Sequence, residues 1–121
     1  MSLNRKTMVE AAKKPVLALD YEIAQEMASA LGRLGHALER ALRTLAEFDA
    51  ENPRDRLQPE ARETRLRLVS AAGIALWSFV VQREACGLRD STWVMRDYKV
   101  PGEVRAHMGV LPGPGPRPRK R

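Results

Sequence analysis

An apolar row that repeats every seven residues for five heptads, starting at Leu17, is the feature that most constrains this chain. Two further rows run beside it. In the row that lies three residues further on, Asp20 is the only polar residue. A stripe this wide is typical of a helix in a bundle, whereas a two-stranded coiled coil needs only a narrow seam. A helix from Leu17 to about Ala50 would be roughly 50 Å long, which is long for a monomer of 121 residues. The members of the first row are Leu17, Ala24, Leu31, Leu38 and Leu45.

The segment 50–59, with Asn52-Pro53 and Pro59, predicts a loop after this helix. A second helix is expected from Pro59, with acidic residues in its first turn, where the helix dipole favours them. Its apolar residues cover most of the circumference, so we expect it to be covered on more than one side. They form one row of Leu66, Val69, Ala72, Gly73, Leu76, Phe79 and Val80, on which Arg83 also falls, and another of Ile74, Trp77, Val81 and Leu88.

Two short helices are expected after the second long helix. Gly87 stands where a left-handed C-terminal cap belongs, and Asp90 or Ser91 can cap the next helix. A last helix is predicted to open at Val100-Pro101 and to end at Gly109. The apolar residues of this region are the expected cover for the second helix, namely Trp93, Val94, Tyr98, Val100, Val104 and Met108.

These elements predict an all-α fold, a long antiparallel helical hairpin with two short C-terminal helices. We expect residues 1–14 to be a flexible basic arm, residues 15–111 a single helical domain, and the Pro/Gly/Arg-rich residues 112–121 a disordered basic tail. The length of the first helix and the apolar surface of the second favour a homodimer. Two hairpins related by a two-fold axis would form a four-helix bundle.

The net charge of +6 belongs to the two ends of the chain. Residues 1–16 carry +3 and residues 112–121 carry +4, so the segment between them carries −1. A nucleic acid or another polyanion would therefore bind through the tails, and a solubilising terminus explains the same composition. The possible nucleic-acid contacts are Arg117, Arg119, Lys120 and Arg121.

Residues 90–109 also have the outline of a DNA-binding helix-turn-helix. Three details argue against that interpretation: Lys99 stands at the usual glycine of the turn, Val104 falls where an exposed residue is expected, and Glu103 lies at the end that would meet DNA. We expect this segment to cap the helical core instead.

Catalytic residues, cofactors and metal ligands are not predicted, and an enzymatic function is the less favoured class. Cys86 has no histidine at a spacing that indicates a nucleophile, and it precedes a helix C-terminus, the wrong end of the dipole for a thiolate. Glu22, Glu26 and Glu84 lack the Glu-x-x-His motif of metal-binding bundles.

The single cysteine fits a reducing compartment. The longest uncharged run, residues 68–81, is shorter than the ~18 residues of a membrane span, and the first residues lack the apolar core of a secretory signal. We therefore expect a cytoplasmic protein.

Charged and aromatic residues gather at the end of the second helix. Arg83 falls on an apolar row, so we expect it to form a charge network with Glu84, Arg89 and Asp90 that ties the C-terminal helices to the hairpin. With Trp93 and Tyr98, these residues are the candidate functional surface.

Three segments carry a resemblance to a known family: LDYEIAQEMASALGRLGHALERAL, ALWSFVVQREACGLRD and YKVPGEVRAHMG. Together they resemble a family of small, uncharacterised helical bacterial proteins known as a domain of unknown function. The resemblance runs from about Leu19 to Gly109 without the loop, and it implies a compact helical domain but no activity. Our leading hypothesis is a dimeric, non-enzymatic interaction or scaffold protein that contacts another protein. The alternative is a small nucleic-acid-associated protein that uses its tails and residues 90–109.

Overall fold

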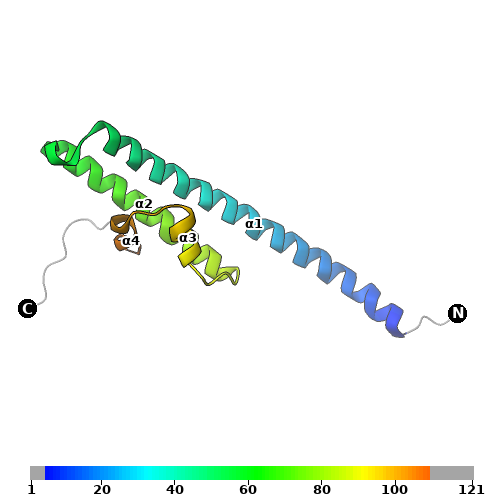
Figure 1. The fold of residues 1–121 in the computed structure, drawn as a ribbon. Helices are drawn as coiled ribbons and strands as arrows, with labels where there is room; N and C mark the ends of the chain where they lie inside the picture. The colour runs from blue at the N-terminus through cyan, green and yellow to red at the C-terminus, as the bar shows by residue number, and fades with distance from the viewer. Residues whose placement is uncertain (1–4, 110–121) are drawn as a thin grey trace, which may run out of the picture.

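The fold is a helical hairpin with two short helices packed beside it (Figure 1). The computed structural model describes the backbone of residues 5–109 and the side chains of residues 17–109. Within this part of the chain every regular element is a helix, which confirms the all-α prediction. The elements are α1 (Arg5–Glu51), the 3-10 turn η1 (Arg54–Arg56), α2 (Pro59–Ala85), α3 (Thr92–Asp97) and α4 (Gly102–Ala106).

The first helix begins earlier than the sequence predicted. It starts at Arg5 rather than near Pro15, so residues 5–14, predicted as a flexible arm, are helical. Alanine and lysine, both strong helix formers, make up much of this segment. The helix runs through Pro15, although a proline removes one backbone hydrogen bond from a helix interior.

The hairpin turns tightly between α1 and α2. Asn52 closes α1, because its backbone N–H and its side-chain amide both donate to the carbonyl oxygen of Phe48, at 2.9 and 3.0 Å. Pro59 then occupies the first turn of α2, where its missing N–H costs nothing. The predicted loop and the predicted start of the second helix are thus confirmed.

The two long helices differ greatly in length. α1 has 47 residues and α2 has 27, which correspond to roughly 70 and 40 Å at 1.5 Å per residue. Asp49 lies level with Arg65 and Gly35 with Phe79, and in both pairs the residue numbers add up to 114. The last residue of α2, Ala85, is therefore level with residue 29 of α1. We call residues 5–28 the overhang, because α1 extends there past the end of α2 (Figure 1).

The core lies between the hairpin and the short helices. Leu38 and Leu76 are fully buried where α1 faces α2, and Val94 and Val104 are fully buried on α3 and α4. Both short helices thus cover α2, as predicted. Several residues expected to be covered are exposed. Leu66 is 61% exposed and its neighbour Arg65 is buried instead, and Trp77, Val81 and Leu88 of the second row are 41, 43 and 46% exposed, because the short helices cover another side of α2. The buried apolar residues are Leu38, Leu45, Val69, Ala72, Leu76, Phe79, Val80, Val94 and Val104.

The end of α2 follows its sequence signals. Gly87 has a φ of 87°. The N–H of Gly87 donates to the carbonyl of Glu84, and that of Leu88 to the carbonyl of Arg83. These are the two bonds of a Schellman motif, so the predicted glycine cap is confirmed.

The short helices are also capped as the sequence indicated. The Asp90 carboxylate accepts the N–H of Thr92 at 3.0 Å and so caps α3. Lys99, at φ 51°, takes the left-handed conformation that ends α3. Gly109 has a φ of 83° just beyond α4, at the predicted stop.

A glycine sets how closely α4 approaches α2. A Cβ at Gly73 would lie 2.9 Å from the carbonyl oxygen of His107, which is closer than real side chains come. The backbone at His107, at the end of α4, can therefore pack directly against the backbone of α2 only because residue 73 has no side chain.

By its length and apolar composition, α2 is also long enough to cross a membrane. The core helix of a folded domain can have the same length and composition, and here α2 supplies most of the core.

Candidate functional site

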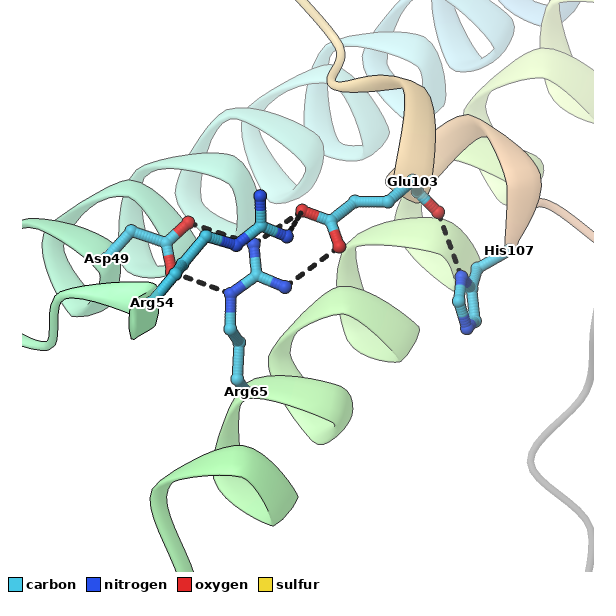
Figure 2. Close-up of polar contacts among 5 residues, drawn as sticks. All are labelled: Asp49, Arg54, Arg65, Glu103 and His107. Atoms are coloured by element: carbon cyan, nitrogen blue, oxygen red, sulfur yellow. Dashed lines mark hydrogen bonds and ion pairs between the residues drawn. The ribbon is translucent and has the colours of Figure 1, made fainter. Parts of the chain in front are cut away.

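A buried arginine joins three elements near the hairpin turn. The guanidinium of Arg65, on α2, donates from Nε and Nη2 to both carboxylate oxygens of Asp49 on α1, at 2.8 and 3.0 Å. It donates from Nη1 and Nη2 to both oxygens of Glu103 on α4. Arg54, in η1, adds a further bond to Glu103 at 2.9 Å. Figure 2 shows this cluster, which we call the Arg65 clamp, with Arg65 between the two carboxylates.

The electrostatics of the clamp favour the ionised forms of Asp49, Arg65 and Glu103. Hydrogen bonds from Arg65 hold the pKa of Asp49 and the pKa of Glu103 below their usual values, against a smaller opposing effect of desolvation. The hydrogen bonds that Arg65 donates, first those to Glu103 and then those to Asp49, raise the pKa of Arg65. Only 9% of the Arg65 side chain is exposed, so its charge depends on these two partners. The clamp therefore fixes α4 on the hairpin.

The sequence predictions missed this cluster. Arg65 lies four residues before Val69 on the buried face of α2, and Asp49 lies four residues after Leu45 on the buried face of α1. Charged residues at the ends of two facing apolar rows are the signal that could have paired them. Glu103 could not have been assigned, because its approach depends on how α4 folds back.

The predicted surface at the other end of α2 forms in part. The Arg83 guanidinium lies 4.9 Å from the Trp93 ring centre and 5.9 Å from that of Phe79, within the range of cation–π attraction. The Tyr98 ring packs edge-on against Phe79 and Trp93. Burial raises the pKa of Tyr98, and the Glu39 and Asp97 carboxylates add to that shift. Arg83, Trp93 and Tyr98 thus come together as expected.

The predicted charge network does not take the expected form. Arg83 donates to the backbone carbonyl of Asp90 at 3.3 Å, while the Asp90 carboxylate caps α3. Between residues 17 and 109, the ion pairs within 4 Å include none that involves Arg83, Glu84 or Arg89. The physical reason is competition: the N-cap of α3 uses Asp90, and the aromatic rings offer Arg83 a stacking partner. Glu84 and Arg89 border an open hollow beside Val81.

Arg83 keeps one unsatisfied group. Its Nε is shielded from solvent and has no hydrogen-bond partner. An unpartnered guanidinium donor is costly where water cannot reach it. Beside it, Trp93 leaves 41% of its surface exposed, so this surface combines an incompletely satisfied arginine with an accessible aromatic ring.

The overhang forms a third notable surface. The heptad row that begins at Leu17 is buried at Leu38 and Leu45, which are 0 and 2% exposed, where α2 lies opposite. Its first two members are exposed: Leu17 is 62% exposed, and Ala24 is also in the exposed part of α1. Tyr21 and Met27, on the neighbouring rows, are exposed too.

The remaining predicted sites are placed as follows. α4 has five residues, Val104 is fully buried, and Glu103 is held by the clamp, so the first turn of the expected recognition helix faces the protein. The proposed tail contacts Arg117, Arg119, Lys120 and Arg121 lie outside the described residues. Cys86 is a half-buried free thiol.

A metal ion needs several ligand side chains in one place. Across the residues that the structure describes, His, Cys, Asp and Glu do not gather in threes where they could hold a metal ion. Glu22 and Glu26 are exposed, and Glu26 lies 3.6 Å from Arg33.

The fold and these surfaces define a small all-helical protein with one long, partly unpaired helix. Residues 2–116 match a family of unknown function, DUF6665. The chain belongs to this family, which confirms the resemblance seen in the sequence. Comparisons with curated proteins and with solved structures returned no match.

Proposed function

We propose that this protein is a self-associating helical scaffold, in which two copies pair through the overhang of α1. One observation carries the proposal. A single heptad row is buried at Leu38 and Leu45 and exposed at Leu17 and Ala24. The chemistry of the row does not change along the helix, whereas the cover supplied by α2 ends level with residue 29.

The exposed part of the row is large enough for its contact with water to cost free energy. Apolar surface left in water costs roughly 25 cal/mol per Å², and contiguous apolar patches on a monomer mark sites of association. Leu17, Tyr21 and Met27 extend the row along more than two helical turns. A partner helix along the overhang would bury all of them.

Two-fold pairing supplies that helix to both copies at once. In a two-fold dimer the same patch of each copy is buried, so one arrangement covers both overhangs. The dimer then contains four long helices, α1 and α2 from each copy, as in a helical bundle. Such a dimer is rigid and elongated, which suits a scaffold.

The surface formed by Arg83 and Trp93 is the place where we propose that a further protein binds. Trp, Tyr and Arg are the residues that contribute most often to binding energy at protein interfaces. Here all three types lie together, with Tyr98 against Trp93, and Trp93 is accessible. The guanidinium of Arg83, which stacks on Trp93, would donate a hydrogen bond to a carbonyl or carboxylate oxygen of the partner.

Light scattering of two matched variants tests the self-association. Leu17 and Leu19 are 62 and 56% exposed, but they differ by about 200° around the helix. We expect the unmodified chain to scatter as about twice 13.6 kDa at micromolar concentration. Leu17→Glu should weaken the dimer at least about tenfold, because it buries a charge, and Leu19→Glu should leave it intact.

A mass of 13.6 kDa for the unmodified chain at tens of micromolar would overturn the proposal. Equal effects of Leu17→Glu and Leu19→Glu would also contradict it, because the pairing face would then not be the heptad row.

A further inference from the structure

The lengths of the two long helices fix how two copies fit together. The overhang comprises residues 5–28, and α2 is 27 residues long. In each copy α1 thus extends past α2 by a stretch that is nearly as long as α2 itself. A second copy turned end to end supplies an α2 of matching length along that stretch.

Resting on the proposed self-association, we infer that the overhang of each copy lies along α2 of the other, with the two α1 helices antiparallel. The overhangs end at residue 28 in both copies, so the two-fold axis passes near residues 28 and 29. Because α2 is antiparallel to its own α1, the overhang and the second copy's α2 run in the same direction.

This placement sets a register. With the axis near residues 28 and 29, and Asp49 level with Arg65 inside each copy, a residue of the overhang is level with the residue 57 positions later in α2 of the second copy. Leu17 is then beside Ile74 of the second copy, and Ala24 beside Val81.

The register brings together two rows that the structure leaves without cover. Val81 is 43% exposed and Ile74 is half-buried. Ile74 and Val81 are spaced by seven residues, as are Leu17 and Ala24. Two helices with apolar residues every seven positions keep the same faces in contact along their length. Leu17 and Ala24 can therefore both pack against their counterparts, Ile74 and Val81, in one arrangement.

Charge favours the antiparallel arrangement over a parallel one. Residues 17–28 carry three acidic side chains and no basic one, whereas residues 29–40 carry two arginines and one glutamate. Parallel α1 helices would set the acidic segments of both copies against each other. In the antiparallel register, residues 17–28 lie beside residues 74–85 of the second copy's α2, which carry one arginine and one glutamate, so like charges are not brought together.

The contact area is that of a stable dimer. A helix face roughly 36 Å long and 10 Å wide, buried on both partners and occurring twice per dimer, amounts to on the order of 1,400 Å². Specific protein interfaces bury about 1,200–2,000 Å². A single contact with an unrelated helix would bury only half of this area, which favours a second copy as the occupant.

Disulfide trapping tests the register in the full chain. The natural thiol is removed with Cys86→Ser, and Leu17→Cys is combined with Ile74→Cys. Within one copy these positions are separated by 23 helix positions along the hairpin, roughly 35 Å, far beyond the reach of a disulfide. A bond between them must join two copies, and mild oxidation should convert most of the chain to covalent dimer.

Two control pairs have matched chemistry. Leu17→Cys with Arg67→Cys moves the second thiol by one heptad, roughly 10 Å along α2. Leu19→Cys with Ile74→Cys turns the first thiol to the opposite side of α1. Both should give at least tenfold less covalent dimer than the Leu17–Ile74 pair, as should Leu17→Cys alone.

The outcomes separate the register from self-association itself. Efficient cross-linking by the Leu17–Ile74 pair alone supports the inference. Light scattering that shows a dimer while the Arg67 pair or Leu17→Cys alone cross-links best would overturn the register and leave the proposed function standing. Monomers under reducing conditions in every variant, with no cross-link, would overturn both.

Discussion

Arg65 is the side chain that connects most of this fold. It makes four hydrogen bonds to two carboxylates on different helices, and 9% of its side chain is exposed. A buried arginine is retained only where its donors are satisfied. In this protein they are satisfied by Asp49, 16 residues away in the chain, and by Glu103, 38 residues away.

Sequence reasoning went wrong at this position for a physical reason. It placed Leu66 in the core, because leucine is apolar and arginine is usually exposed. The helical phase of Val69, Ala72 and Leu76 points to residue 65 instead. Only the fold shows that two carboxylates arrive there to compensate the charge. By contrast, Arg83 was chosen correctly as unusual, yet its partners proved to be aromatic rings rather than carboxylates.

Replacing Arg65 by methionine should be strongly destabilising. The substitution keeps much of the volume but leaves Asp49 and Glu103 together without their main cation. We expect a loss of about 3 kcal/mol in the free energy of unfolding, measured by urea denaturation at neutral pH. Arg62→Met, on the exposed side of the same helix, should change stability by less than about 0.5 kcal/mol. Equal stability of Arg65→Met and the unmodified protein would show that the clamp contributes nothing.

The helices differ in how well their ends could be predicted. The start of α2 at Pro59, its stop at Gly87 and the cap of α3 by Asp90 all follow from local residues, because caps and prolines act within one turn. The start of α1 at Arg5 was missed, since Pro15 was taken as a boundary. The position of α4 depends on Gly73 and Glu103 together, and no local pattern contains both.

The attachment of α4 should depend on pH. Hydrogen bonds from Arg65 lower the pKa of Glu103 in the folded protein, so the unfolded chain binds a proton to this carboxyl more readily. The ionised clamp therefore stabilises the fold fully above the ordinary pKa of a glutamate, about 4.3. That contribution is lost as the pH falls through the lower pKa of the folded state.

Glu103→Gln isolates this effect. At pH 7 the variant should be less stable than the unmodified protein by about 1–2 kcal/mol, the value of charge-assisted hydrogen bonds. The difference should begin to shrink below the ordinary pKa of a glutamate, about 4.3, and should approach zero only below the lowered pKa of the folded state, where Glu103 takes up its proton. Thermal unfolding followed by circular dichroism between pH 3 and 7 measures it, and Glu63→Gln, exposed on α2, is the control. A difference that is the same at all pH values would rule out ionisation as its source.

The overall shape follows from the mismatch between α1 and α2. The heptad row showed that α1 would be long, and the composition of α2 showed that it needs cover on several sides. Neither could show how far α1 extends past α2, because that depends on which residues are level across the hairpin. The pairs Asp49–Arg65 and Gly35–Phe79 fix that level, and with it the exposed row at Leu17 and Ala24.

A dimer held together by the overhang should unfold at a temperature that depends on protein concentration. Binding adds a free energy that grows with the logarithm of concentration, by about 2.7 kcal/mol for a hundredfold change. Between 1 and 100 µM we therefore expect the unfolding midpoint to rise by roughly 5 °C or more, measured by scanning calorimetry or by Trp77 and Trp93 fluorescence. Leu17→Glu should unfold at a lower temperature that no longer varies with concentration, because its overhang has no partner to lose. A concentration-independent midpoint in the unmodified chain would mean that each copy is stable by itself, and that the apolar row on the overhang does not contribute to the stability of the fold.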